Sequence, residues 1–360
     1  MPLPERSTSL RIWTGSVLAL ALAWCVVPQG ARAQVWSSRL AQEPACQTLT
    51  PSAAGGPMPR DPNVMVLRYL GVSNYEMAYR DVVILLDAGI ERLAWWLPTG
   101  VSRDDMTKRV NGIFIGHAHG EHMWDAPFIA QKTGALVVAD PIGMKWVRST
   151  GLLSEKQMAT VRGLGAQGET FTFNGFTVKA VLGRHNVVPG EYMAKNRAAA
   201  EAITRQGPLS EVEQKRNQEL GALVRLAEDE AQKLGSEGTI TYSFAFDNGF
   251  KLWYGDSAGP PTAAEQQFAK EIPGGIDVGL IPYYGGELGV PITMEYVRLF
   301  KPKIFLPTHH DGQRARMLDM PLGPIALAIR EEFPRTRAIS PLYRTPVCVD
   351  TMTKEVYVGQ

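Results

Sequence analysis

All six histidines of this 360-residue chain lie in three short segments, and each segment follows an apolar run typical of a buried strand. The segments are residues 117–122, His185 and the pair His309–His310, and the preceding runs are 112–116, 171–182 and 304–306. Histidines kept for packing or solubility would also occur in helices and over the surface. The observed placement instead favours imidazoles that converge at one edge of a sheet.

Short strand patterns bounded by turn residues predict the fold class. Helical patterns alternate with these strands later in the chain. The predicted strands are 64–67, 82–86, 112–116, 135–138, two within 171–182, 278–281 and 304–306. The predicted helices are 141–148, about 294–300 and about 325–332. Meandering strands followed by strand–helix alternation predict an α/β protein with mixed sheets and outer helices.

The first 33 residues have the three parts of a secretory signal peptide. These parts are the basic Arg6 and Arg11, the apolar run 12–27, and the small-residue site Ala31-Arg32-Ala33. We therefore predict cleavage between Ala33 and Gln34 and a secreted or periplasmic protein without stable membrane insertion. The alternative is an uncleaved anchor, but the apolar run is shorter than the roughly 20 residues that a membrane span needs.

Charge and cysteine content narrow the class of function further. The chain has 37 Lys and Arg against 36 Asp and Glu. It therefore has no excess of positive charge that would attract a polyanion, and a nucleic-acid substrate is not expected. After cleavage, Cys46 and Cys348 are the remaining cysteines. In an oxidising compartment they either form a disulfide or stay as two separate buried thiols.

The mature chain is predicted to have an irregular arm at 34–62 and one domain at 63–360. The domain pattern is interrupted at about 191–234, where almost no strand formers occur and two helices are predicted. The insertion begins soon after His185. It is therefore either an amphipathic segment that packs on the core or a lid beside the site.

The first histidine segment has the spacing of metal ligands. His117 and His119 are two residues apart, so in an extended turn both imidazoles can face one cation. Glu121 and His122 can then reach a second cation about 3.5–4 Å from the first. Imidazole and carboxylate ligands suit zinc, with manganese or iron as alternatives. Asp256 also follows an apolar run, and it either completes this set or serves an ordinary turn.

Taken in order, these motifs resemble those of the metallo-β-lactamase-fold hydrolase superfamily, from about Val64 to His310. The resemblance implies a four-layer αββα sandwich of two mixed β-sheets with outer helices, holding two divalent cations. It assigns His117, His119 and His185 to one cation, Glu121, His122 and His309 to the other, and Asp256 to a place between them. By the same resemblance, Asp87 braces the histidine segment through hydrogen bonds, and His310 is the competitor of His309.

Position 121 departs from the family pattern, which usually has Asp there. The extra methylene of Glu121 moves the carboxylate by about 1.5 Å. The second cation site is therefore expected to be distorted, weaker or selective for a metal other than zinc. In the family this residue also orients the attacking water, and Glu121 keeps the charge and the acceptor oxygens for that role.

The resemblance also implies a reaction on a small molecule. Two cations that share one water lower its pKa from about 15.7 towards about 7, which provides hydroxide to attack a carbonyl or phosphorus atom. Glu121 or Asp256 would accept the proton of that water. The motifs look most like the lactonase and phospholipase-D-like branch, so a lactone, ester or phosphodiester is expected. Members that hydrolyse β-lactams generally lack an aspartate at the position of Asp256.

Alternative interpretations remain for the function and for several aromatic residues. The same fold also supports iron-dependent oxidoreductases such as sulfur dioxygenases, β-lactam hydrolases, and a non-catalytic exported binding protein that kept the scaffold. Tyr283 and Tyr284 either contact the substrate or pack as buried aromatics, and Trp95, Trp96 and Trp124 either wall a pocket or pack in the core. The sequence predicts no oligomeric state.

Overall fold

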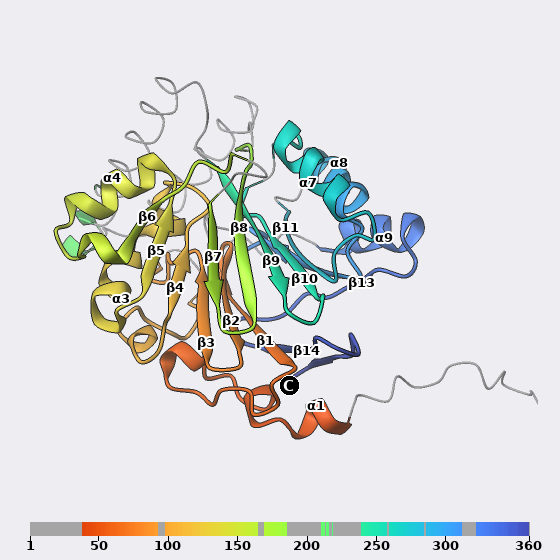
Figure 1. Cartoon of the computed structure of the whole chain (residues 1–360), viewed down its shortest axis with the longest axis horizontal. Coiled ribbons are helices and arrows are strands. Elements are labelled where there is room, and N and C mark those ends of the chain that lie inside the picture. The colour runs from red at the N-terminus through yellow and green to blue at the C-terminus, as the bar shows by residue number, and fades with distance from the viewer. Residues whose placement is uncertain are drawn as a thin grey trace, which may run out of the picture. The chain divides into compact units, whose positions relative to one another are not determined.

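Two mixed β-sheets form the centre of the protein in the computed structural model (Figure 1). The residues that the structure describes are 38–92, 98–164, 169–185, 239–257, 259–283, 286–311 and 322–359, with a few residues between 210 and 218. All of them belong to the unit Trp36–Gln360. The predicted signal peptide, most of the predicted insertion at 191–234, and Trp95, Trp96 and Tyr284 lie outside the described residues.

The first sheet has eight strands in the order β15–β14–β1–β2–β3–β4–β5–β6. Their bounds are β15 Val356–Val358, β14 Pro346–Asp350, β1 Val64–Gly71, β2 Asn74–Tyr79, β3 Val82–Leu86, β4 Gly112–Phe114, β5 Leu136–Ala139 and β6 Met158–Thr160. Pairing is antiparallel from β15 to β3 and parallel from β3 to β6. The sheet is therefore mixed, as predicted.

The second sheet has seven strands in the order β13–β12–β11–β10–β9–β8–β7. Their bounds are β13 Arg337–Ala338, β12 Ile304–Thr308, β11 Val278–Pro282, β10 Lys251–Tyr254, β9 Ile240–Phe246, β8 Phe176–Leu182 and β7 Thr170–Phe173. Pairing is parallel from β13 to β10 and antiparallel from β10 to β7.

Helices cover the outer face of each sheet. The first sheet is covered by α3 (Ala126–Thr133) and α4 (Pro141–Ser149), and the second by α7 (Ala263–Glu271), α8 (Gly286–Phe300) and α9 (Gly323–Glu332). Helix α4 begins directly after Asp140, because the side chain of this residue caps the helix by accepting hydrogen bonds from the backbone N–H groups of Ile142 and Gly143. The remaining described helices are the short α1 (Ser38–Gln42) and α2 (Gly120–Met123), and none of the described helices is long and apolar enough to cross a membrane.

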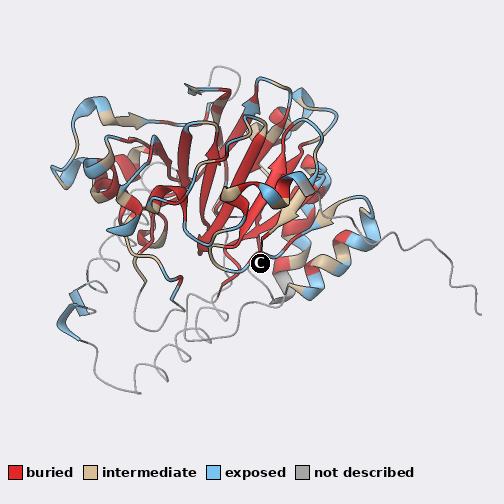
Figure 2. Cartoon of the chain, turned by 90° about the horizontal axis from the view of Figure 1, so that it is seen from below, coloured by how far each residue is buried: buried red, intermediate tan, exposed pale blue. Residues whose placement is uncertain are grey.

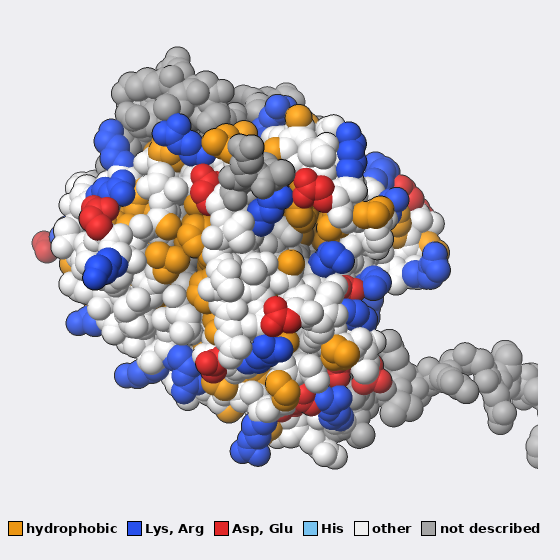
Figure 3. Space-filling view, viewed as in Figure 1, with side chains coloured by type: hydrophobic (Ala, Val, Ile, Leu, Met, Phe, Trp, Pro, Cys, Tyr) orange, Lys and Arg blue, Asp and Glu red, His pale blue; other side chains and the backbone are white. Residues whose placement is uncertain are grey.

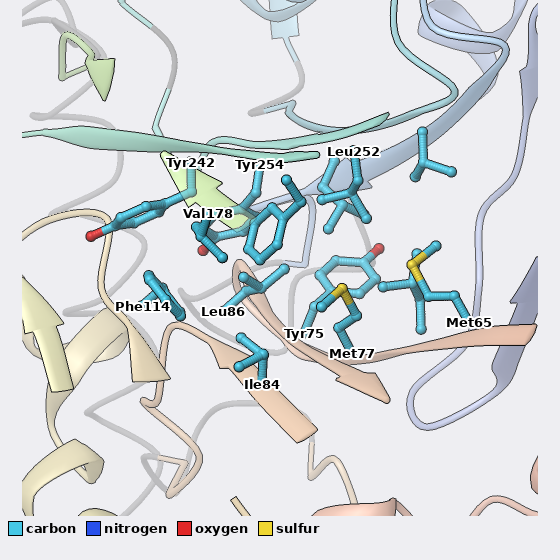
Figure 4. Close-up of a cluster of buried hydrophobic side chains, with 14 of the residues drawn as sticks. Met65, Tyr75, Met77, Ile84, Leu86, Phe114, Val178, Tyr242, Leu252 and Tyr254 are labelled. Atoms are coloured by element: carbon cyan, nitrogen blue, oxygen red, sulfur yellow. The ribbon is translucent and has the colours of Figure 1, made fainter. Parts of the chain in front are cut away.

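The alternation of side chains along the strands builds the layers, because successive residues point to opposite faces of a sheet. In β3, Val83 and Leu85 join the apolar cluster under α3 and α4, while Ile84 and Leu86 join the cluster between the sheets. Trp253 of β10 likewise packs with residues of α7, α8 and α9. Figure 4 shows side chains of both sheets meeting in the inner cluster, and Figure 2 shows the strands buried between partly exposed helices. The expected αββα sandwich is confirmed.

The predicted strands are confirmed with small shifts of their ends, and the helix predicted at about 294–300 already begins at Gly286. Strands β6, β9, β13, β14 and β15 were not predicted. β2 was not predicted either, and β1 continues to Gly71. The physical reason is a buried ion pair. Arg68 of β1 faces Glu76 of β2 across the ladder, the two side chains lie 2.8 Å apart, and neither is exposed. Charged residues in a strand conceal the apolar pattern on which the prediction depended. Helices α3 and α7 were also not predicted.

The N-terminal arm is more ordered than the predicted irregular segment. Besides α1 it contains two 3₁₀ turns, Pro44–Cys46 and Ser52–Ala54. The carboxylate of Glu76 accepts hydrogen bonds from the backbone N–H groups of Ser52 and Ala53. Cys46 and Cys348 form a disulfide with their Cα atoms 6.0 Å apart, which joins the arm to β14. Of the two states left open for these cysteines, the structure has the disulfide.

Charged side chains are dispersed over the surface that is visible in Figure 3. Lys and Arg side chains lie among Asp, Glu and uncharged residues on this face and are not gathered in one patch. This distribution agrees with the formal net charge of +1.

Reduction of the Cys46–Cys348 disulfide is expected to lower the free energy of unfolding by about 2–4 kcal/mol, because the bond restricts an unfolded loop. The cysteines are 302 residues apart in sequence. Urea unfolding with and without dithiothreitol measures the effect. The double variant Cys46→Ser/Cys348→Ser is the control, because reductant should leave its unfolding curve unchanged. An unfolding midpoint of the native chain that is insensitive to reduction would contradict the prediction.

Glu265 at the start of α7 is expected to make stability depend on pH. Burial raises the pKa of its carboxyl to about 7, despite hydrogen bonds from Thr262 and Tyr296. The unfolded chain releases this proton near its ordinary pKa of 4.5, so stability falls as pH rises from about 4.5 to about 7.

Glu265→Gln removes this ionisation. The variant should therefore gain roughly 1–3 kcal/mol relative to the wild type between pH 4.5 and pH 8. Chemical denaturation at both pH values measures the difference, and Glu271→Gln on the exposed side of the same helix is the matched control. Parallel pH dependence of Glu265→Gln and the wild type would show that the buried carboxyl does not have this effect.

Candidate metal centre

The predicted ligands follow strands whose carboxyl ends lie at one edge of the sandwich. The pairings make β1, β3 and β4 run in one direction in the first sheet, and β8, β10 and β12 in one direction in the second. Two hydrogen bonds join these edges of the sheets. The backbone N–H of Ile240 donates to the carbonyl of Gly116 at 2.7 Å, and the hydroxyl of Tyr75 donates to the carbonyl of Pro307 at 2.9 Å.

One group of imidazoles is formed by His117, His119 and His185, as the motifs predict. The ring centroids of His117 and His119 are 4.4 Å apart, and those of His117 and His185 are 4.7 Å apart. One ligand atom of each residue lies within 4.8 Å of the others. Three residues from the ends of β4 and β8 can therefore hold one cation.

A second group is formed by Glu121, His122 and His309, whose ligand atoms also lie within 4.8 Å of one another. Glu121 and His122 lie in α2, and His309 follows β12 of the other sheet. The centroids of the His122 and His309 rings are 5.2 Å apart. Glu121 is half-buried, and the structure brings its carboxylate to the place that the resemblance assigns to an aspartate.

Asp256 lies between the two groups and is completely buried. Its Oδ2 atom is 2.6 Å from Nδ1 of His117 and 3.5 Å from Nδ1 of His122. The segment that follows β4 leaves room for this carboxylate because residue 116 is glycine, and a Cβ atom there would overlap the Asp256 side chain. Gly116 is thus a requirement for the close approach of the two sheets at the site.

Asp87 holds the histidine segment in the way expected of it. Its Oδ1 atom accepts a hydrogen bond from the backbone N–H of Gly116 at 2.9 Å, and its Oδ2 atom is 2.6 Å from Nδ1 of His122. The Ser73 hydroxyl donates to the same Oδ2 atom at 2.5 Å. Asp87 is completely buried and has a left-handed backbone conformation with φ of 60°.

The structure separates the neighbouring His309 and His310. His309 has φ of 56°, and this left-handed turn after β12 directs its side chain to Glu121 and His122. The ring of His310 instead stacks on Tyr69 with the centroids 4.5 Å apart. Of the two candidates, His309 is therefore the one that lies with Glu121 and His122 in a group that could hold a cation.

The pKa values of two clustered imidazoles, His117 and His309, are lowered, which favours the neutral form that binds metal ions. Burial, reinforced by the neighbouring His122 and His119, lowers the pKa of His117 well below its usual range. Burial likewise lowers the pKa of His309 to about 3 and that of His310 to about 4. For Glu121, burial opposes ionisation, but the surrounding imidazoles outweigh it and lower the pKa to about 2.

The pKa values of His122 and Asp256 are both raised, for different reasons. Burial disfavours a charged His122, but the carboxylates of Asp87, Asp256 and Glu121 raise its pKa to about 9. Burial, together with Asp87, raises the pKa of Asp256 well above its usual range. A divalent cation placed here would compensate the same negative charge and displace these protons.

The donor atoms fit divalent cations. The Nε2 atoms of His117 and His122 are buried and have no hydrogen-bond partner among the described residues. In each ring the Nδ1 atom contacts a carboxylate, that of Asp256 or Asp87, so Nε2 is the nitrogen left to bind a metal. A carboxylate on the second ring nitrogen is the usual support of a metal-binding histidine.

The predicted substrate contacts receive less support from the geometry. Tyr283 is buried with 1% of its surface exposed and packs in the apolar cluster of α8, which corresponds to the packing alternative. Trp124 is half-buried. Tyr284, Trp95 and Trp96 lie outside the described residues.

Two residues beside the site were not predicted: Ser73 in the turn between β1 and β2, and Asn74 at the start of β2. Ser73 contacts Asp87 and His122, and Asn74 bonds to the backbone of Gly89 and Glu121. The available signal was ordinary turn chemistry, which does not indicate proximity to a site. Their position became evident only from the pairing of the strands.

Comparison with known proteins gives relatives over part of the chain, although no protein-family model matches it. A protein of Brucella anthropi named UPF0173 metal-dependent hydrolase is 31% identical over 122 residues, which cover 34% of this chain and 48% of that protein. A Rhizobium leguminosarum protein with the same description is 31% identical over 111 residues, 30% of this chain and 46% of the relative. The chain therefore spans about half the length of the curated relatives it matches.

Solved structures match over more of the chain. Igni18, described as a novel metallo hydrolase from Ignicoccus hospitalis, superimposes with a TM-score of 0.52 and 15% identity over 79% of this chain and 98% of that one. A possible metal-dependent hydrolase from Veillonella parvula gives a TM-score of 0.51 with 11% identity and the same coverage. At such identities the likeness concerns the fold alone. With its two-sheet topology, the chain shares the layered fold of these two structures, which is the αββα sandwich that the resemblance implied.

Gly116→Ala is expected to weaken metal binding at least about 10-fold, because the added methyl displaces Asp256 from between the two ligand groups. Zinc bound per chain after dialysis, measured by atomic spectroscopy, tests this expectation. Gly323→Ala is the control, since a Cβ atom at that helical position meets nothing within 4 Å. Full zinc occupancy of Gly116→Ala would contradict the assigned place of Asp256.

Proposed function

We propose that this protein is an exported metal-dependent hydrolase that holds two divalent cations, most suitably zinc, and acts on a small lactone, ester or phosphodiester. One observation carries the proposal: seven potential ligands, supplied by four segments far apart in sequence, meet at one edge of the sandwich. The seven are His117, His119, Glu121, His122, His185, Asp256 and His309. The relatives named metal-dependent hydrolases support the same chemistry.

In this proposal each ligand group holds one cation and Asp256 lies between them. When bound, two such cations supply Lewis-acid polarisation of a substrate oxygen and a water of lowered pKa. Asp256 accepts the Nδ1–H of His117 on Oδ2, which orients that imidazole. Asp87 does the same for His122. These two contacts fix the imidazoles before substrate arrives, so little reorganisation is needed during the reaction.

Glu121 is the proposed proton acceptor. Its pKa of about 2 keeps it ionised near neutral pH, and its half-buried position leaves the carboxylate within reach of a substrate or water. Asp256 is the second carboxylate able to take part in proton transfer. Asp256 is completely buried, and its Oδ2 atom lies 2.6 Å from Nδ1 of His117, so in the loaded site it would be an ionised carboxylate and the alternative proton acceptor.

Export is supported by two features of the chain. The first is the predicted signal peptide at 1–33, and the second is the Cys46–Cys348 disulfide, a bond that persists in oxidising compartments. The near-neutral charge favours a small substrate over a polyanion. The class of lactone, ester or phosphodiester is drawn from the resemblance of the motifs.

The test is hydrolysis by purified protein loaded with zinc, manganese or iron, on lactone, ester, phosphodiester and β-lactam panels. We expect activity that is lost on chelation and restored by metal. Asp256→Asn should lower kcat/KM by about 100-fold or more, because it removes a carboxylate placed between two cations. Asp247→Asn on the exposed β9–β10 turn is the matched control.

Three outcomes would contradict the proposal. Turnover that survives complete metal removal would exclude metal-dependent hydrolysis. Unchanged kcat/KM in Asp256→Asn would exclude a role of this carboxylate between the cations. Bound iron with oxidation and no hydrolysis would favour the oxidoreductase alternative.

A further inference from the structure

We propose that Ser73 is a positioning residue for His122, and that the turn between β1 and β2 aligns His122 with His309 for one shared cation. This inference rests on the proposed function, because it concerns the metal group of Glu121, His122 and His309. Ser73 does not contact that cation in the proposal. It acts through the imidazole of His122.

The turn lies where both sheets meet. It connects the end of β1 to the start of β2, which places it at the same edge as the ends of β3 and β4. Val72 in this turn is completely buried and has φ of 56°. A β-branched residue in the left-handed region is strained, and such strain persists only where the surroundings impose it.

The segment that contains His309, directly after β12 of the second sheet, helps to impose this conformation on Val72. The backbone N–H of His309 donates to the carbonyl of Val72 at 2.6 Å. The backbone N–H of Val72 donates to Oδ1 of Asp311 at 2.9 Å. Arg92 and Tyr343 donate to the other oxygen of Asp311 and keep that carboxylate in place. The turn and the His309 segment are thus joined in both directions.

The next residue of the turn contacts the first sheet. The hydroxyl of Ser73 donates to Oδ2 of Asp87 at 2.5 Å, and its oxygen is 2.7 Å from Nδ1 of His122. Because a carboxylate only accepts hydrogen bonds, Nδ1 of His122 carries a proton that is shared between Asp87 and Ser73. This arrangement fixes the ring orientation and leaves Nε2 as the metal-binding atom.

Two adjacent residues therefore hold two ligands that come from different sheets. Val72 bonds to the backbone of His309, and Ser73 bonds to the ring of His122. The carbonyl of Ser73 also accepts a hydrogen bond from the hydroxyl of Tyr254, two residues before Asp256. Ser73 is completely buried, so its hydroxyl bonds to these groups without competition from bulk water. The Ser73 hydroxyl bonds to Asp87 and His122, which do not belong to the first cation group of His117, His119 and His185, so that group should be affected little.

The test is calorimetric titration of metal-free purified protein with zinc, with bound zinc per chain counted by mass spectrometry. The wild type should bind two equivalents. Ser73→Ala should bind the first with nearly unchanged affinity and the second about 10- to 100-fold more weakly. Ser73→Thr keeps the hydroxyl and should recover most of the second affinity. A replacement that merely loosened the fold would weaken both equivalents.

Ser52→Ala is the matched control, because Ser52 is an equally buried serine whose hydroxyl bonds to Pro57, away from the site. It should bind two equivalents like the wild type. Equal affinities of Ser73→Ala and the wild type for the second zinc, or equal loss of both equivalents, would overturn the role of Ser73. Binding of fewer than two zinc ions by the wild type would overturn the two-metal proposal itself, which is a distinct result.

Discussion

The apolar layer between the two sheets confines the polar chemistry of this protein to one edge. Inward-facing side chains such as Leu86 and Leu252 fill that layer, so the carboxylates and imidazoles of the site gather where the strands end. The parallel course of β3 with β4, and of β8 with β10 and β12, brings those ends to one place. A cluster of carboxylates and imidazoles is costly when buried, and it is stable there because cations can compensate its charge.

The contacts around the site form two connected supports. Asp87 and Ser73 contact the ring of His122, which follows a strand of the first sheet. Val72 and Asp311 join the same turn to the segment of His309, which follows a strand of the second sheet. Gly116 keeps the space in which Asp256 can approach both. The ligand geometry therefore depends on small residues and backbone groups as much as on the ligands. This dependence explains why the surroundings of such a centre tolerate little change in volume.

Much of the site could be predicted because its residues carry their own chemical signal. Histidine is a rare residue type, and it occurs in the run from His117 to His122 and at the isolated His185, both at strand ends. The order of these motifs along the chain alone indicated the superfamily and the layered fold. The strand β2 and the role of Ser73 could not be predicted in this way. Arg68 and Glu76 neutralise each other only after the strands have paired, and Ser73 reaches His122 only through that pairing.

The placement of β14 has a consequence for how the chain reaches its final state. This strand, residues 346–350, inserts beside β1, residues 64–71, so the first sheet is incomplete until residues 346–350 are available. Contacts between such distant segments form slowly, since a very long loop must close first. In the export that we propose, this late pairing would keep the first sheet open during translocation, and the disulfide between Cys46 and Cys348 would then link the arm to β14.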